Sequence, residues 1–504
     1  MGAVEAVEPN FGEAHFGKAP LGDVRRVRRL VKLADRMVAR PGASLPNQVQ
    51  DQAAYQALLG LVRRQEVTHQ AVSQTHQDRT CSLVRCHPGT VLILHDTTEL
   101  DYTSHKSLKK VGQIGDGKGR GYECHNSLAV VADTGEILGL ANQILHHRDD
   151  VPKGEGVAAK RERETRESLL WIKGTAAVAE RCATFGPGLE GHLEVHVFDR
   201  GGDTFENLEA QALAERTYVG RSSHNRAIAI GHEDQQQSGL LHDDARSLAE
   251  VGRLTVEVPA VEAKAARDGQ PAVPAQPART ATVAVAFAAV QVKAPHVKRG
   301  KHGNDPLKVW VVRVWEVDAP EGVEPLEWLL LTNYAVRTFA DACQVKSWYE
   351  TRWTIEDYHK GQKTGCAIEK PQFTKEERLE PVIALLSVIA VWLLRLRWLS
   401  RQEGLKEAPA VQVVPPVYVA VLSVTLGKGR CLDLSAAEFF LGLARLGGYD
   451  YPRKGRPPGW LVLWRGWGQL QSRVQYALAA GVESLDSIQP IPHPDCEPDT
   501  APSG

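Results

Sequence analysis

The spacing of apolar and polar positions separates the chain into helical ends and a strand-rich centre. Between residues 20 and 80, alanine- and leucine-rich stretches place apolar side chains at helical intervals, which predicts a small helical domain. From Pro88 the pattern changes to strands, and Val91–Leu94 is a short, continuous apolar run typical of a strand buried on both faces. After Thr338 the pattern returns to helix. Helical domains are therefore expected at both ends of the chain.

A mixed α/β unit is predicted after the first helical domain. Ser127–Val131 and Ile137–Leu140 flank the turn sequence Asp133–Gly135, which predicts a hairpin. A helix is expected over Glu162–Ala179, although a glycine inside it weakens its second half. His192–Phe198 then alternates like a strand. Strands followed by a helix and another strand are typical of a mixed sheet.

Residues 217–332 differ in composition and are predicted to be β-rich. Apolar runs predict strands around residues 254–258, 283–287, 309–317 and 328–331. The stretch Ala260–Pro277 is rich in alanine and proline, and is expected to be a surface loop or linker.

The C-terminal region is predicted to be helical. Ser435 and Glu438 have the spacing of a capping box, which begins a helix. Trp460, Trp464 and Trp467 form an aromatic stripe on another helix and are expected to pack in a core. The expected organisation is a helical N-terminal domain (1–80), an α/β core in two parts (81–216 and 333–402) with a β-rich insertion between them (217–332), a helical C-terminal region (403–490) and a loose tail (491–504).

Composition is that of a soluble protein with several cores. Of 504 residues, 43% are hydrophobic and 24% are charged, and the formal net charge is −1. The first 20 residues lack the apolar stretch of a secretory signal. The longest apolar run, Val382–Leu394, is shorter than the ~20 residues that a bilayer requires, so a buried helix is favoured over a membrane span. The eight cysteines are scattered, and Cys81, Cys86 and His87 have no second pair at zinc-like spacing. A cytoplasmic protein is expected.

Positive charge is concentrated between Leu21 and Arg40, despite the balanced total. The basic positions are Arg25, Arg26, Arg28, Arg29, Lys32, Arg36 and Arg40, against only Asp23 and Asp35. One interpretation is an ordinary helix with a solvated basic face. The other is a surface that holds DNA phosphates, because Arg and Lys attract DNA independently of its sequence.

Two apolar strands are each followed by an aspartate. The first strand runs into Asp96-Thr97-Thr98, and the second runs into Asp199-Arg200. Ligand-binding groups in α/β sheets lie at the carboxyl ends of strands, where side chains leave the core for a crevice. Either aspartate alone could be a turn or a helix cap, whereas two of them make a shared metal site a reasonable hypothesis.

The segment Tyr349–Lys363 supplies a third carboxylate. On one helix at ~100° per residue, Tyr349, Arg352, Glu356 and Lys363 fall within a wedge of about 60°. The face could simply be solvated. It also has the residue types of a phosphodiester site, with one carboxylate for a metal and two cations for phosphate. Two divalent ions can activate a nucleophile and stabilise the leaving oxygen in phosphoryl transfer, and Mg²⁺ prefers oxygen ligands.

With these residues the chain resembles the bacterial DDE transposases of the insertion-sequence-four family, especially the transposon-five type that cuts through a DNA hairpin. The Tyr-x2-Arg-x3-Glu-x6-Lys spacing looks like the family signature, and the blocks beginning at Asp96 and at Asp199 and Asp203 match its first two catalytic blocks in order. Leu21–Asp23, Pro325–Thr332 and Leu443–Gly448 look like further family segments. The resemblance therefore covers nearly the whole chain.

The resemblance implies a ribonuclease-H-like core in which Asp96, Asp199 and Glu356 hold Mg²⁺, for which Mn²⁺ can substitute. It implies that Trp328 stacks on a flipped base. DNA contacts are then expected from Tyr349, Arg352, Lys363, Arg221, His224, Arg25, Arg26 and Arg29. The partners would be double-stranded DNA, comprising the inverted repeats and the target, and a second subunit held through the C-terminal region.

Three functions are compared on this basis. A cut-and-paste transposase in a bacterial cytoplasm, associated with the nucleoid, is favoured. A transposase-derived DNA-binding protein that no longer cuts is the alternative, although it would need none of the three carboxylates. A glycoside hydrolase is disfavoured, because Arg and Lys beside the glutamate suit phosphate better than sugar.

Overall fold

The computed structural model describes residues 10–149, 163–230, 237–260, 274–295, 302–429, 432–450 and 458–479, with a few isolated positions between these ranges. Most of the alanine- and proline-rich loop predicted at Ala260–Pro277, and the whole tail predicted at 491–504, lie outside the described residues.

The N-terminal region is helical, as predicted. It contains α1 (Phe11–Phe16), α2 (Val24–Ala39), α3 (Leu45–Val49), α4 (Gln52–Leu61) and α5 (His69–Arg85). Side chains cap three of these helices: Asp23 accepts from Arg25 N at 2.8 Å, Asp51 from Ala54 N at 2.6 Å, and Thr68 from Ala71 N at 3.1 Å. The last helix, α5, continues past residue 80 and packs against the sheet and α12, so it joins the first helices to the core.

The described strands form one 12-stranded, mostly antiparallel sheet, which makes the protein mixed α/β. The strands of its first half are β1 (Thr90–Asp101), β2 (Gly112–Ile114), β3 (Gly119–Val131), β4 (Ile137–His146), β5 (Leu193–Phe198) and β6 (Thr217–Arg221). The predicted hairpin is confirmed as β3 and β4. β1 pairs antiparallel with β3 on one side and parallel with β5 on the other, and β5 pairs parallel with β6.

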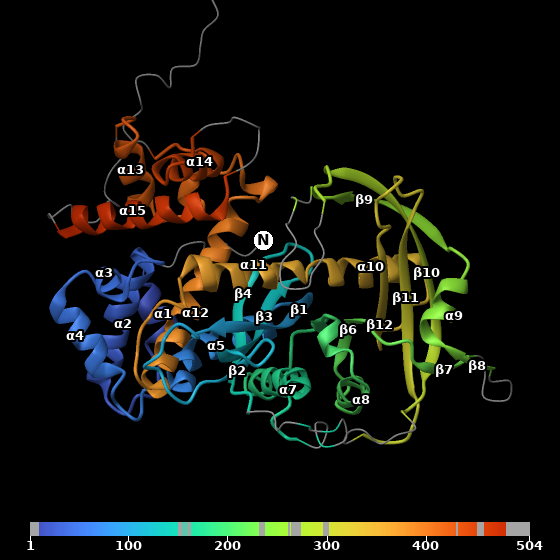
Figure 1. Ribbon diagram of the computed structural model, residues 1–504. Coiled ribbons are helices and arrows are strands. Elements are labelled where there is room, and N and C mark those ends of the chain that lie inside the picture. Colours follow the sequence, from blue (N-terminus) through green and yellow to red (C-terminus); the bar gives the residue numbers. More distant parts are fainter. Residues whose placement is uncertain are drawn as a thin grey trace, which may run out of the picture.

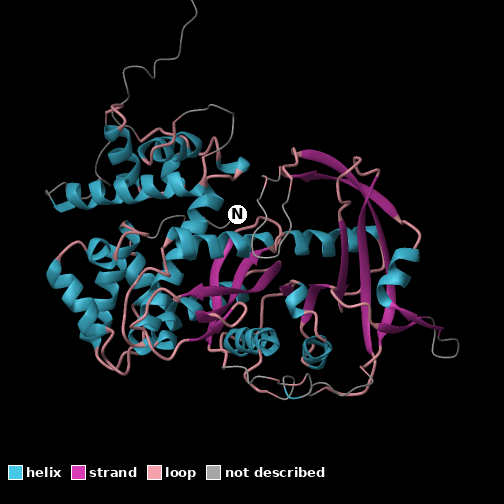
Figure 2. Ribbon diagram, in the orientation of Figure 1, coloured by secondary structure: helices cyan, strands magenta, loops and turns pink. Residues whose placement is uncertain are grey.

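The β-rich segment extends this sheet instead of forming a separate one. Its further strands are β7 (Ala227–Ile230), β8 (Gln237–Leu240), β9 (Gly252–Val258), β10 (Arg279–Val292), β11 (Leu307–Val317) and β12 (Glu327–Thr332). The four strands predicted here are confirmed as β9 to β12. β12 pairs with both β11 and β6, and so connects the two halves of the sheet. Figure 2 shows the long strands of this segment curving away from the core at the end of the molecule opposite the N-terminal helices.

The helix predicted over Glu162–Ala179 begins later than expected. Glu162 lies outside the described residues, a 3-10 turn covers Glu167–Leu169, and α7 runs over Leu170–Ala183. Arg166 is extended (φ −72°, ψ 141°), which prevents an earlier start. Gly174 lies within α7 because a Cβ there would come 2.5 Å from Nε2 of His125. This glycine therefore permits close packing of α7 on the sheet. Two shorter helices, α8 (Phe205–Leu213) and α9 (Leu241–Ser247), complete this part.

The segment predicted as one helix around Glu356 is divided into three parts. α10 covers Phe339–Glu350, α11 covers Trp353–Lys360, and a five-residue π-helix covers Gly361–Gly365. Thr351 and Arg352 keep right-handed helical torsions, so α10 and α11 run on in nearly one direction (Figure 1). The expectation of a single α-helical register to Lys363 is wrong, because a π-helix winds more residues per turn and rotates Lys363 relative to Glu356.

The C-terminal region is helical, as predicted. Its helices are α12 (Glu376–Leu399), α13 (Pro416–Thr425), α14 (Ala436–Leu446) and α15 (Trp460–Ala479), with 3-10 turns at Glu403–Leu405 and Ala410–Gln412. The capping box of Ser435 and Glu438 is confirmed. Trp464 and Trp467 are buried, as expected, whereas Trp460 is half-buried.

Helix α12 is long and apolar enough to cross a membrane by length and composition alone, but 89% of its most apolar window is buried inside the protein. This burial is the arrangement predicted for Val382–Leu394. Figure 1 shows α13 to α15 beside the N-terminal helices, at the same end of the molecule.

Candidate functional site

Asp96 and Asp199 lie on neighbouring parallel strands. Asp199 directly follows β5 and caps the 3-10 turn Arg200–Gly202, accepting from Gly201 N at 2.8 Å. Asp96 does not end its strand as predicted, because β1 continues to Asp101 against the long partner β3. The register pairs His95 with Phe198, so Asp96 lies where β5 stops and next to Asp199.

Glu356 reaches this edge of the sheet from α11, and Arg352 connects it to Asp96. The Arg352 guanidinium donates from Nη1 to Asp96 Oδ2 at 3.2 Å and from Nη2 to Glu356 Oε1. Only 8% of Arg352 is exposed to solvent. Two of the three predicted carboxylates are thus joined through one arginine, and the third, Asp199, follows the strand next to that of Asp96.

Burial, the negative charge of Asp199 and a smaller contribution from Glu356 together raise the pKa of Asp96 to about 7. The charge of Arg352 and the N–H of Thr97 act in the opposite direction, but they do not compensate. The site therefore carries more negative potential than one guanidinium neutralises, which favours a bound cation.

The donor set agrees with Mg²⁺ in kind, since it consists of hard carboxylate oxygens. Over the ranges that the structure describes, no three His, Cys, Asp or Glu side chains lie close enough together to form a ready metal site. Arg352 lies between Asp96 and Glu356 and hydrogen-bonds to both. The residues fit a divalent ion by chemistry and charge, and binding it would require Arg352 to move.

A buried chain of hydrogen bonds supports the two elements that carry Asp96 and Glu356. Asn126 is the register partner of Asp96 on β3, and its Nδ2 donates to His359 Nε2 on α11 at 3.1 Å. Gln143 Nε2 donates to Asn126 Oδ1 at 2.7 Å, and His69 Nε2 donates to Gln143 Oε1 at 2.8 Å. Burial lowers the pKa of His359 to about 3, which keeps it neutral and able to accept.

This chain of hydrogen bonds was not predicted from the sequence. Its members are contributed by α5, β4, β3 and α11, and the Asn126–His359 pair is separated by 233 residues. The only available signal was the position of His359 three residues after Glu356, which places both on one side of α11.

Tyr349, Trp328 and Arg221 lie together beside the carboxylates. Tyr349 is buried, and the half-buried Trp328 packs edge-on against it at a centroid distance of 6.0 Å. Arg221, at the end of β6, is also half-buried and donates to the Glu327 backbone oxygen at 3.1 Å. Trp353 was not singled out by the sequence, yet 61% of it is exposed next to Arg352.

The remaining predicted contacts lie further out. Lys363 is 4.0 Å from the carboxylate of Glu369. His224 is exposed, and its backbone N–H donates to Asp203 at 3.2 Å. A cavity of about 330 Å³ beside this loop is lined by Arg200, Arg221, Ser222, Ser223, His242, Arg246, Glu327 and Leu329.

The side chain of Asp203 contacts this loop. Its side chain is buried, pairs with Arg226 at 2.5 Å and accepts from Ser223 N at 2.6 Å. The second acidic residue of the Asp-Arg-x-x-Asp block is therefore engaged in contacts with Arg226 and the loop backbone.

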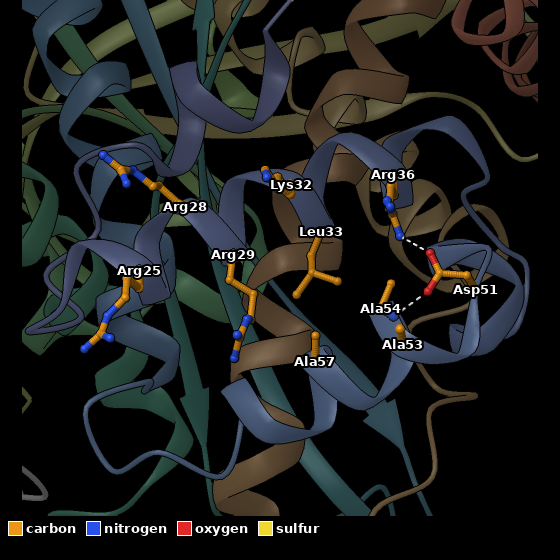
Figure 3. A pocket seen from close by; sticks show the side chains of 10 residues that line it. All are labelled: Arg25, Arg28, Arg29, Lys32, Leu33, Arg36, Asp51, Ala53, Ala54 and Ala57. Carbon is orange, nitrogen blue, oxygen red and sulfur yellow. Dashed lines mark hydrogen bonds and ion pairs between the residues drawn. The ribbon is translucent and has the colours of Figure 1, made fainter. Parts of the chain in front are cut away.

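The basic positions of α2 line a groove of about 530 Å³ against α4 (Figure 3). The groove residues are Arg25, Arg28, Arg29, Lys32, Leu33 and Arg36, with Asp51, Ala53, Ala54 and Ala57. Arg25 pairs with Asp23 at 3.1 Å and Arg36 with Asp51 at 2.5 Å. Arg26 does not line the groove and pairs with Glu66 at 2.8 Å.

Three cations in this groove, Arg28, Arg29 and Lys32, have no carboxylate partner in the part of the chain that the structure describes. The facing wall on α4 is made of alanines. A cationic groove with a small-residue wall suits a phosphate backbone.

Residues 9–67 match the family model described as transposase DNA-binding. The matched region contains α1 to α4 and the whole α2–α4 groove. The match supports a transposase that binds DNA, with DNA as its partner. The predictions of a transposase and of a DNA partner are confirmed at this level.

Proposed function

We propose that the protein is a DDE transposase of the insertion-sequence-four family, transposon-five type, which excises a DNA element and joins it to target DNA. The observation that carries the proposal is the cluster around Asp96. A half-buried aspartate, whose pKa is raised to about 7 by desolvation and by the charges of Asp199 and Glu356, lies in a chain whose N-terminal region matches a transposase DNA-binding family. Perturbed carboxyl groups of this kind are typical of functional sites.

The sheet supports the ribonuclease-H-like core in this proposal. Three neighbouring strands, β4, β3 and β1, are antiparallel, and β5 and β6 follow in parallel. The proposed core therefore consists of these five strands with Glu356 on α11. It takes β6 (Thr217–Arg221) from the insertion predicted over 217–332, and leaves β7 to β12 as the insertion.

In the proposed mechanism Asp96, Asp199 and Glu356 hold Mg²⁺. When bound, the metal activates the attacking oxygen and stabilises the leaving oxygen of a phosphodiester. Arg352 would have to leave the carboxylates before a metal could bind, and its two Nη groups would then be free to bind a DNA phosphate. Arg352 would thus neutralise the empty site and hold phosphate in the loaded one.

The aromatic residues suit the rest of the reaction. Excision through a hairpin requires a 3′-hydroxyl, freed by a first nick, to attack the opposite strand, and a flipped base needs a stacking surface. The half-buried Trp328, which packs against Tyr349, and the exposed Trp353, next to Arg352, would supply such surfaces. Two subunits, paired through the C-terminal region, would each bind one end.

A second candidate is a transposase-derived DNA-binding protein that does not cut. The Arg352 bridge between Asp96 and Glu356 favours it, because an arginine can stabilise the carboxylates permanently without a metal. The two candidates agree on DNA binding and differ only in metal-dependent cleavage.

The test uses end-labelled DNA that carries the inverted repeats flanking the gene. The wild-type protein should nick the repeat boundary in Mg²⁺ and not in Ca²⁺, and Glu356→Gln should bind the DNA without cutting it. Glu350→Gln is the matched control, because Glu350 pairs with Lys346 at 2.6 Å on α10 and touches none of the site. Tight binding by the wild type without nicks in either metal would favour the second candidate.

A further inference from the structure

A second cationic groove lies where three distant segments meet. The junction groove has a volume of about 670 Å³ and is formed by the end of α2 with its following loop, the π-helix after α11, and α15. The lining residues used below are Arg40, Gly42, Thr364, Arg465, Gln469 and Arg473. None of the residues singled out as DNA contacts from the sequence lines it.

Glycines allow the three segments to approach one another closely. A Cβ on Gly42 would lie 2.6 Å from the Gly365 carbonyl oxygen, and a Cβ on Gly468 would lie 2.7 Å from the Ala39 carbonyl oxygen. A Cβ on Gly365 would lie 2.5 Å from the ring of Trp464. Backbone therefore packs against backbone and a buried indole, so the walls of the groove have fixed positions.

The groove is positively charged and has no acidic residue in its lining. Arg40, Arg465 and Arg473 are all exposed, and none pairs with a carboxylate of a described residue. No Asp or Glu occurs anywhere in Trp460–Ala479, which forms α15. Three unneutralised guanidinium groups at a fixed junction attract a polyanion.

Helix α15 has one buried apolar face and one exposed face that carries its basic residues. Leu463, Trp467, Leu470 and Val474 are buried. Arg465, Gln469 and Arg473 recur every four residues on the outer side and are exposed. Arg465 and Arg473 are eight residues apart, so their Cα atoms are about 12 Å apart at 1.5 Å per residue. That separation corresponds to roughly three to four nucleotides at 3.4 Å per nucleotide of one strand.

We propose that the junction groove holds the phosphodiester backbone of DNA and forms a second DNA-contacting surface beyond the α2–α4 groove. The inference deepens the DNA-binding role proposed above and does not depend on cleavage. Arg40 directly follows α2, so the basic positions of the first groove continue into the second. A second copy of the chain docked here by a twofold axis would bring like charges together, which disfavours a subunit interface at this face.

The test measures DNA binding by the full-length protein at several salt concentrations, with fluorescence anisotropy and DNA carrying the flanking repeats. In the double variant Arg465→Ala/Arg473→Ala, loss of two phosphate contacts should reduce the slope of log K against log[salt] by about 1.8. The same loss corresponds to roughly 30-fold weaker binding at 0.15 M salt. Replacement of both arginines by lysine should restore most of the slope, since lysine keeps the charge.

Two controls make the outcome specific. Arg253→Ala removes an exposed arginine that pairs with Glu250 at 3.0 Å on the distant β9 end, and should leave the slope unchanged. Arg29→Ala, in the α2–α4 groove, should reduce it by about 0.9. If the slope is unchanged in the double variant while Arg29→Ala weakens binding, the proposal that the junction groove binds DNA is overturned, and DNA binding by the α2–α4 groove still stands.

Loss of dimer formation in the double variant at an unchanged salt slope, measured by sedimentation, would also overturn the proposal, because the groove would then belong to a subunit interface. Thermal unfolding of each variant separates weakened binding from misfolding. A wild type that binds with the expected slopes but never cleaves would overturn the proposed chemistry and leave this inference supported.

Discussion

Replacing Asp96 by Asn should stabilise the metal-free protein above pH 7 while abolishing cleavage. The amide has nearly the shape of the carboxyl and no charge, so it resembles the protonated form that the folded protein favours. Asn at this position can still accept from Thr97 N, which donates to Asp96 at 2.8 Å. The change therefore removes mainly the cost of desolvating a negative charge, together with its repulsion by Asp199 and Glu356.

The pKa of Asp96 sets the size of the effect. Folding raises this pKa from its ordinary 3.8 to about 7. Between those pH values the folded protein keeps a proton that the unfolded chain has released, so stability falls as pH rises and the full penalty is present above pH 7. The difference between these two pKa values corresponds to about 4 kcal/mol. Asp96→Asn should recover an amount of that order at pH 8 and close to none at pH 4.

The assay is urea unfolding of both proteins at pH 4, 6 and 8 without metal. Asp341→Asn serves as a control of opposite sign, because the Arg337 N–H and Thr338 hold the pKa of Asp341 below its usual value. Adding Mg²⁺ should stabilise the wild type at pH 8 and not Asp96→Asn, since only the carboxylate attracts the ion. If Asp96→Asn is no more stable than wild type at pH 8, the electrostatic account of the site is wrong.

Three further outcomes follow from the same contacts. Gln143→Leu should slow cleavage and increase amide hydrogen exchange in α11, because it breaks the buried chain to His359; Gln211→Leu, in an equally buried amide that donates to Thr175 at 2.9 Å, should change neither. Trp353→Ala should slow cleavage with little loss of stability, because its indole is 61% exposed and is available for stacking on a base; equal rates for the two proteins would exclude that role. Arg352→Ala should raise the pKa of Asp96 further by removing a positive charge, so that the pH midpoint of stability moves upward in unfolding titrations; an unmoved midpoint would contradict the ion pair.

Local structure was largely predictable from the sequence. The hairpin of β3 and β4 and the capping box at Ser435 depend on neighbouring residues, and both are confirmed. The pairing of β12 with β6 was not predictable, because it joins Leu331 to Gly220 across more than a hundred residues. Periodicity identifies a strand and its faces but not its distant partner.

The candidate site shows a similar division. Spacing and resemblance singled out Asp96, Asp199 and Glu356, and in the structure the charges of Asp199 and Glu356 both act on Asp96. A helical wheel shows which side chains share a face and not which atoms they contact, so the bridge of Arg352 between two of the carboxylates was not foreseen. The chain of hydrogen bonds through Gln143 corresponds to no short sequence motif, because its members come from four separate elements.

The most direct test of the central claim, that Asp96, Asp199 and Glu356 hold a catalytic metal, is a change of metal preference in Asp96→Cys. A thiolate is a soft ligand that binds Mg²⁺ poorly and accepts Mn²⁺ more readily. Cleavage of the flanking-repeat DNA should be lost in Mg²⁺ and return in Mn²⁺, while the wild type cuts in both. Cleavage by Asp96→Cys at the wild-type rate in Mg²⁺ would mean that this side chain does not bind the metal, and would contradict the account.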